Sequence, residues 1–126
     1  WTSLFTDGIS LYSDFTSAYD SESNKIIIVG KNPQGSRRCY AIDATSGMIS
    51  EISNEGYSVD RLATAAYDIE SDRVVVFGMG TGTSEKVVNG YNYNTNTWED
   101  LTTEGMLISQ EFTATYDIQM DMIILI

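Results

Sequence analysis

A repeat with a period of 48 to 49 residues runs through the sequence and limits the folds that the chain can adopt. Three segments share one pattern, in which small or hydroxyl residues precede a Tyr-Asp pair, a polar turn and an aliphatic run. The pairs begin at Tyr19, Tyr67 and Tyr116. Periods of roughly 20 to 50 residues are typical of solenoids and propellers, in which each repeat is one supersecondary unit.

Two tryptophans keep the same register as the Tyr-Asp pairs. Trp1 precedes Tyr19 by 18 positions, and Trp98 precedes Tyr116 by the same 18 positions. In the middle unit Ile49 takes this place and keeps an apolar side chain. The pattern therefore predicts that the first residues of the sequence are the end of an earlier unit.

Each unit is predicted to contain four short strands, which in the clearest unit are expected at 63–67, 73–77, 86–92 and 98–101. The first strand has small residues, which suit a crowded central axis. The second is a continuous β-branched run, as expected of a strand that is covered on both faces. The segment between them, 68–72, begins and ends in aspartate, whose carboxylates can accept hydrogen bonds from their own backbone in a tight turn. No segment shows helical periodicity, so the sequence predicts an all-β fold.

Three further features belong to a known pattern. The run 91–98 reads Tyr-Asn-Tyr-Asn-Thr-Asn-Thr-Trp, an apolar strand ends in Gly78-Met79-Gly80, and Arg61 stands ahead of a strand of small residues. Together they resemble a kelch repeat, whose period is about 50 residues. The resemblance covers essentially the whole chain, although the double glycine of the family is reduced to Gly30-Lys31 in one unit. It implies a kelch-type β-propeller fragment made of four-stranded antiparallel blades.

The resemblance makes residues 1–126 part of one propeller domain. It implies that residues 1–5 are the outer strand of a preceding blade, that 15–53 and 62–101 are blades, and that 111–126 are the first half of a further blade. Closed propellers have about 4 to 8 blades. We therefore expect the native protein to be longer, with the remaining blades of the same propeller in contact with this segment.

The charge of the chain limits its partners. The sequence has 7 Lys plus Arg against 18 Asp plus Glu, a formal net charge of -11. A surface this acidic repels nucleic-acid phosphates and anionic lipid headgroups. Apolar runs such as 122–126 are much shorter than the roughly 20 residues of a membrane helix, and a single cysteine, Cys39, allows no disulfide within the chain. We expect no nucleic acid and no membrane as partners, and a cytoplasmic location, free or associated with the cytoskeleton or a large assembly.

The residue types for catalysis are scarce. Histidine, the commonest general base and metal ligand, is absent. Copper-radical oxidases share the kelch propeller, but the copper site in that family needs histidines, so Cys39-Tyr40 is not such a site. Asp20, Asp68 and Asp117 recur in every unit, which favours structural turns over unique reacting groups. The sequence therefore predicts no enzyme, no catalytic residue, no cofactor and no metal site.

Function is expected in the segments that do not repeat. Residues 31–38 hold three of the seven cations, whereas the matching segment 79–85 holds none. Loops on a rigid scaffold commonly carry function, and Arg37 and Arg38 are suited to fork onto a partner carboxylate. The alternative is that these cations only offset the acidic surface. The candidate partner-binding residues are Lys31, Arg37, Arg38 and Arg61.

The leading hypothesis is a protein-protein interaction module, which means a kelch propeller that serves as scaffold or adaptor within a larger protein or assembly. The partners are expected to be other proteins with basic or mixed-charge surfaces. Two alternatives stay open. One is a kelch-fold enzyme whose active site lies outside this segment, and the other is a purely structural propeller in a large complex.

Overall fold

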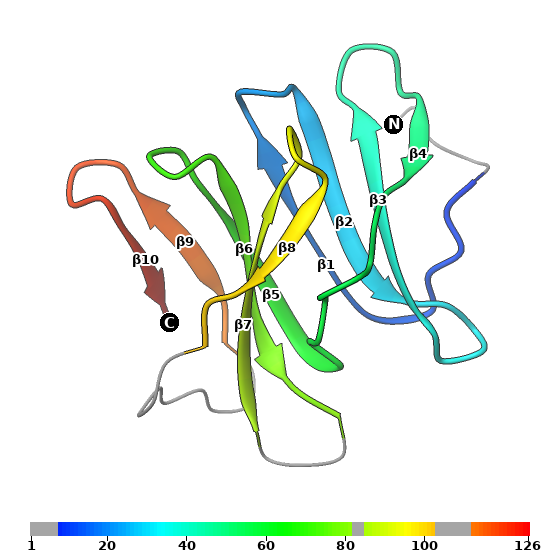
Figure 1. The fold of residues 1–126 in the computed structure, drawn as a ribbon. Coiled ribbons are helices and arrows are strands. Elements are labelled where there is room, and N and C mark those ends of the chain that lie inside the picture. Colours follow the sequence, from blue (N-terminus) through cyan, green and yellow to red (C-terminus); the bar gives the residue numbers. More distant parts are fainter. Residues whose placement is uncertain (1–7, 82–84, 103–111) are drawn as a thin grey trace.

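The computed structural model describes residues 8–81, 85–102 and 112–126 (Figure 1). These residues form two four-stranded antiparallel sheets and one two-stranded antiparallel sheet, with no helix. Strands that are consecutive in the sequence are neighbours in each sheet. The all-β class with four-stranded antiparallel sheets is confirmed. The described part of the chain accordingly offers no helix of the length and apolarity that crossing a membrane requires.

The first sheet consists of β1 (Ser13–Asp20), β2 (Lys25–Lys31), β3 (Arg37–Asp43) and β4 (Ile49–Glu51). The second consists of β5 (Arg61–Asp68), β6 (Arg73–Met79), β7 (Lys86–Asn92) and β8 (Thr97–Asp100). The third consists of β9 (Ala114–Asp117) and β10 (Met122–Leu125). The outer strand expected at residues 1–5 lies outside the described residues, and so does residue 111.

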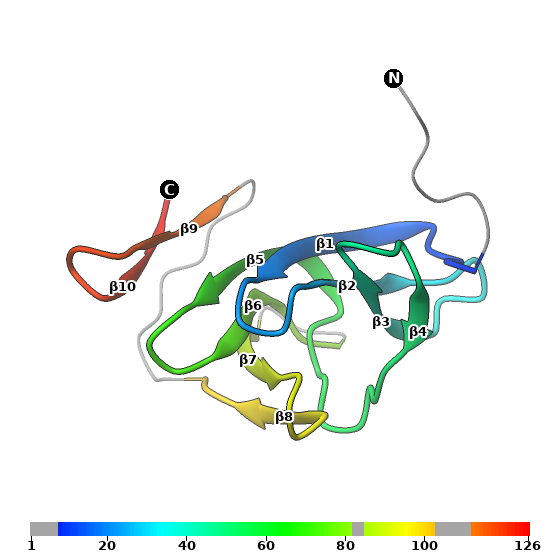
Figure 2. The same cartoon turned by 90° about the horizontal axis from the view of Figure 1, so that it is seen from above.

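The first strands of the three sheets lie in a row, since β1 contacts β5 and β5 contacts β9 (Figure 2). The second sheet is the middle layer, and β6 buries side chains on both of its faces. Val74 and Val76 pack in one cluster with Ile27 and Val29 of β2. Val75, on the opposite face of β6, packs in a second cluster that includes residues of β9 and β10. This two-sided burial agrees with the continuous β-branched run, and each fully buried valine contributes roughly 1.5 to 3 kcal/mol.

One end of the sheets carries tight turns after β1, β3, β5, β7 and β9, and we call it the turn end (at the top of Figure 1). Asp20, Asp68 and Asp117 each accept hydrogen bonds there from backbone N–H groups two or three residues further on. These bonds satisfy the turn backbone, which is the structural role expected of the repeated aspartates.

The tyrosine of each Tyr-Asp pair closes the same turn from the other side. The hydroxyl groups of Tyr67 and Tyr116 donate to Oδ1 of Asp72 and Asp121, both at 2.8 Å. Asp72 and Asp121 have positive φ angles of 51° and 50°, and Tyr19 makes the corresponding bond with a left-handed asparagine. Asn and Asp tolerate this conformation better than most residues. The repeated tyrosines therefore fix the turns, and Tyr67 also packs against the first core cluster.

The opposite end carries the loop 32–36 and the connection 52–60, and we call it the loop end. The sequence suggested one loop over 31–38, but the loop is shorter because β2 and β3 remain paired as far as Lys31 and Arg37. Oδ1 of Asn32 accepts hydrogen bonds from the backbone N–H groups of Gln34 (3.1 Å) and Ser36 (2.9 Å) and so shapes the remaining loop. The three cations expected in the loop, Lys31, Arg37 and Arg38, are therefore strand residues with directions set by the sheet.

Candidate functional site

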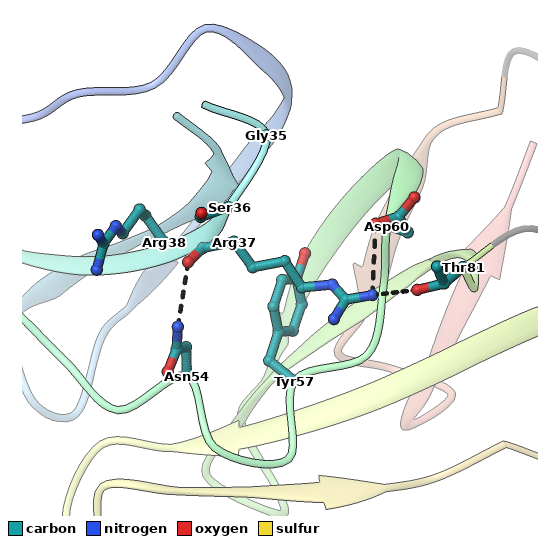
Figure 3. A pocket seen from close by; sticks show the side chains of 8 residues that line it. All are labelled: Gly35, Ser36, Arg37, Arg38, Asn54, Tyr57, Asp60 and Thr81. Carbon is teal, nitrogen blue, oxygen red and sulfur yellow. Dashed lines mark hydrogen bonds and ion pairs between the residues drawn. The ribbon is translucent and has the colours of Figure 1, made fainter. Parts of the chain in front are cut away.

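A polar cavity of about 530 Å³ opens at the loop end where the first sheet meets the connection 52–60 (Figure 3). Its walls come from the loop before β3, from the start of β3, from the connection and from the segment after β6. The lining residues are Gly35, Ser36, Arg37, Arg38, Asn54, Tyr57, Asp60 and Thr81. Two of the four predicted partner-binding residues are among them.

Asp60 joins two cations of the first sheet. Its Oδ2 lies 2.9 Å from Nζ of Lys31, and its Oδ1 lies 3.4 Å from Nη2 of Arg37. Arg37 also donates from Nε to the carbonyl oxygen of Val59 at 3.1 Å and from Nη2 to Oγ1 of Thr81. Lys31 and Arg37 thus tie the first sheet to the connection and to the second sheet. Because two cations share one carboxylate, this group of three side chains carries a net positive charge.

The connection that carries Asp60 is fixed by a buried amide. Asn89 on β7 has 0% of its surface exposed, and its Oδ1 accepts hydrogen bonds from the backbone N–H groups of Ser58 at 2.8 Å and Val59 at 3.3 Å. A buried backbone donor without such a partner is costly. Asn89 therefore determines where Asp60 lies relative to Arg37.

Aromatic contacts hold the other half of the connection. The ring of Trp98 on β8 lies 4.7 Å from that of Tyr57 and 4.8 Å from that of Tyr91, and its Nε1 donates to the carbonyl oxygen of Ser53 at 2.8 Å. Burial raises the pKa of the Tyr57 hydroxyl, so this group is neutral at physiological pH. Asn54 in the same segment donates from Nδ2 to the carbonyl oxygen of Arg37 at 3.1 Å. The cavity thus has rigid walls on the side of the connection.

Arg38 has a different environment from Arg37. Side chains alternate between the faces of a strand, and Figure 3 shows Arg37 and Arg38 pointing in opposite directions. Nη1 of Arg38 lies 2.8 Å from Oε1 of Glu51, and the two side chains are 40% and 55% exposed. Exposed pairs of this kind contribute about 0 to 1 kcal/mol. The structure therefore does not bring the two guanidinium groups onto one point, and it leaves Arg38 with only a weak tether.

The remaining predicted residue lies elsewhere at the loop end. Arg61 begins β5, is exposed, and is not among the residues that line the cavity. The next residue, Leu62, has a φ of 55° at an irregularity in the β5–β6 register, and its N–H donates to Oδ1 of Asp14 at 3.3 Å. Asp14, with a φ of 51°, has the same place in β1. At this part of the loop end the first two sheets are therefore in contact through two residues with strained backbone conformations.

A second cavity, of about 420 Å³, shares Arg37 and Thr81 with the first. Its lining also includes Glu85 and Asp100, in addition to serine and threonine residues. The carboxylates on this side of Arg37 make the second cavity a poorer place for an anion. The first cavity is consequently the better candidate for a ligand that carries negative charge.

Groups with other chemistry are scarce in the described residues. Cys39 is fully buried on β3, and burial raises the pKa of its thiol to about 12, so the thiolate is not formed at physiological pH. Within residues 8–81, 85–102 and 112–126, no three or more Cys, Asp or Glu side chains converge as metal ligands. The site as described is a set of hydrogen-bond donors, acceptors and fixed charges.

No family model, curated protein or solved structure matches this chain.

Proposed function

We propose that this chain is part of a kelch-type β-propeller that acts as a protein-protein interaction module, with partners docking at the loop end. The kelch pattern in the sequence supports the propeller. The successive four-stranded antiparallel sheets with neighbouring first strands are consistent with it. The division into blades at 15–53 and 62–101, with a further half-blade at 111–126, belongs to this proposal.

The observation that carries the docking site is the rigid polar cavity at the loop end. Its walls hold Arg37 in a fixed position, while Arg38 at the rim is tethered only through an exposed ion pair. Binding sites commonly combine rigid scaffold positions with a few adaptable polar groups. Among the residues that the structure describes at the turn end, the ion pairs of Lys25 and Arg73 lie within their own sheets, whereas Arg37 bonds to the connection and to Thr81 beyond its sheet.

A steric block tests the docking end. Ser36 is exposed on the cavity rim, and Ser21 is exposed in the first turn at the opposite end, so Ser36→Tyr and Ser21→Tyr are matched variants. We expect proteins that co-purify with the tagged protein from its native source to be lost with Ser36→Tyr and retained with Ser21→Tyr. Quantitative mass spectrometry of the captured proteins gives the readout.

The result also separates the alternatives. A purely structural propeller that is enclosed in a complex would lose partners with both variants. Capture of the same proteins by both variants and by the unmodified chain would exclude the loop end as the docking surface. An unchanged partner set together with loss of a chemical activity would instead favour a kelch-fold enzyme.

A further inference from the structure

The loop-end cavity has a local charge that differs from the charge of the chain. Lys31, Arg37 and Arg38 form ion pairs with two carboxylates, those of Asp60 and Glu51, so these five side chains carry one positive charge in excess. Glu85 and Asp100 lie in the lining of the second cavity, on the other side of Arg37. The whole chain has a net charge of -11. A small region of opposite sign on an acidic protein favours an anionic ligand.

The two arginines have separable roles toward such a ligand. Arg37 is held by Val59, Asp60 and Thr81, so it supplies a fixed positive field beside the cavity. Arg38 is bound to one exposed carboxylate, which an incoming carboxylate can replace at little net cost, since the exposed pair contributes about 0 to 1 kcal/mol. The exchange leaves one ion pair broken and one formed.

We infer that the loop-end cavity binds the carboxylate of an Asp or Glu side chain in an extended segment of a partner protein, and that Arg38 transfers from Glu51 to that carboxylate on binding. This inference rests on the proposed function and adds the chemistry of the partner. The amide of Asn54 and the hydroxyl groups of Ser36 and Tyr57 complete a polar lining for the peptide around the acidic side chain.

Selection from a random peptide library displayed on phage, with the tagged protein as bait, tests the inference. We expect the enriched peptides to share an acidic residue. A fluorescein-labelled copy of one such peptide, compared with a copy in which that residue is changed to its amide, should lose affinity by about tenfold or more, as expected for a charge-assisted hydrogen bond.

Two variants of the protein test the exchange of partners by Arg38. Arg38→Gln should weaken binding of the labelled peptide by about tenfold or more. Glu51→Gln removes the competing carboxylate and should strengthen binding by up to about fivefold.

The control variants come from the Arg73–Glu99 pair at the turn end. That pair has a 2.9 Å separation with side chains 35% and 58% exposed, so it closely matches the Arg38–Glu51 pair. Arg73→Gln and Glu99→Gln change the net charge by the same amounts and should leave binding unchanged.

The other outcomes are distinct. Enriched peptides without acidic residues that still require Arg38 would overturn the inference and leave the proposed function standing. If the Arg38 and Arg73 variants weaken binding equally, the peptide responds only to the net charge of the protein. That result would also overturn the inference. Displacement of the peptide by inorganic phosphate at constant ionic strength would assign the cavity to phosphate rather than to a protein carboxylate. If no peptide is enriched, or if none responds to Ser36→Tyr, both the inference and the proposed docking site are wrong.

Discussion

Replacement of Asn89 by alanine should lower the free energy of unfolding by about 3 kcal/mol. The Oδ1 atom of Asn89 accepts hydrogen bonds from two backbone N–H groups, those of Ser58 and Val59. Val59 is only 2% exposed, so its N–H has no access to water when the amide is removed, whereas Ser58 is part-buried and can recruit a water molecule. An unsatisfied buried donor costs about 1 to 3 kcal/mol. About 2 kcal/mol for Val59 and about 1 kcal/mol for Ser58 give the expected total.

Urea unfolding followed by circular dichroism measures this change. Asn94→Ala is the control, because Asn94 is also a side-chain amide with hydrogen bonds, but these lie on the exposed surface of the turn end. We expect it to change the free energy of unfolding by less than about 1 kcal/mol. If the two variants have equal effects, or if Asn89→Ala costs less than about 1 kcal/mol, then the amide does not hold the connection and the reasoning about the cavity wall is wrong.

Three other substitutions test separate parts of the structure. Trp98→Ala should destabilise the fold by about 3 to 5 kcal/mol, because the ring contacts with Tyr57 and Tyr91 are lost. Trp98→Phe should cost only about 1 kcal/mol, for the lost hydrogen bond to Ser53. Equal effects of the two variants in urea unfolding would refute the packing role of the ring. Leu62→Asn should stabilise the fold by about 1 kcal/mol, because asparagine tolerates the φ of 55° better than leucine does, and a loss of stability would show that the leucine side chain outweighs the strain. The pKa of Glu22 is raised from its ordinary 4.5 by a hydrogen bond to Asp72 and by its negative charge, so protonation of Glu22 stabilises the contact. That stabilisation is complete below the ordinary pKa and is lost as the pH rises through the folded-state pKa. Glu22→Gln should therefore have a higher urea midpoint than the unmodified protein at about pH 7 and the same midpoint at about pH 4. A pH-independent difference would contradict the raised pKa of Glu22.

Much of the fold follows from residues that repeat. The continuous aliphatic run predicted a strand buried on both faces, and β6 packs against residues of both neighbouring sheets. The hydrogen bond from each repeated tyrosine was missed, although its acceptors, Asn24, Asp72 and Asp121, also recur, each five residues after the tyrosine. The sequence thus contained the acceptors at a constant spacing. The hydrogen bond could be recognised only once the left-handed conformation of these residues was known.

The candidate site is less accessible to sequence reasoning because it depends on contacts between segments that do not repeat. The ion pair from Lys31 to Asp60 joins the end of β2 to the connection that follows β4. No local pattern marks Asn54 or Tyr57 as neighbours of Arg37. The opposite directions of Arg37 and Arg38 follow from strand alternation, but only once β3 is known to begin at Arg37.

Cross-linking of the native protein with a lysine-reactive reagent tests most directly whether partners dock at the loop end. The lysines of the sequence are Lys25, Lys31 and Lys86. Lys31 and Lys86 are strand ends at the loop end, and Lys25 is at the turn end. Lys25 and Lys31 are matched, since both side chains are 20% exposed and both are in ion pairs. We predict cross-links to other proteins through Lys31 or Lys86 and not through Lys25. Cross-links that form only through Lys25 would place the partners at the turn end and contradict the account.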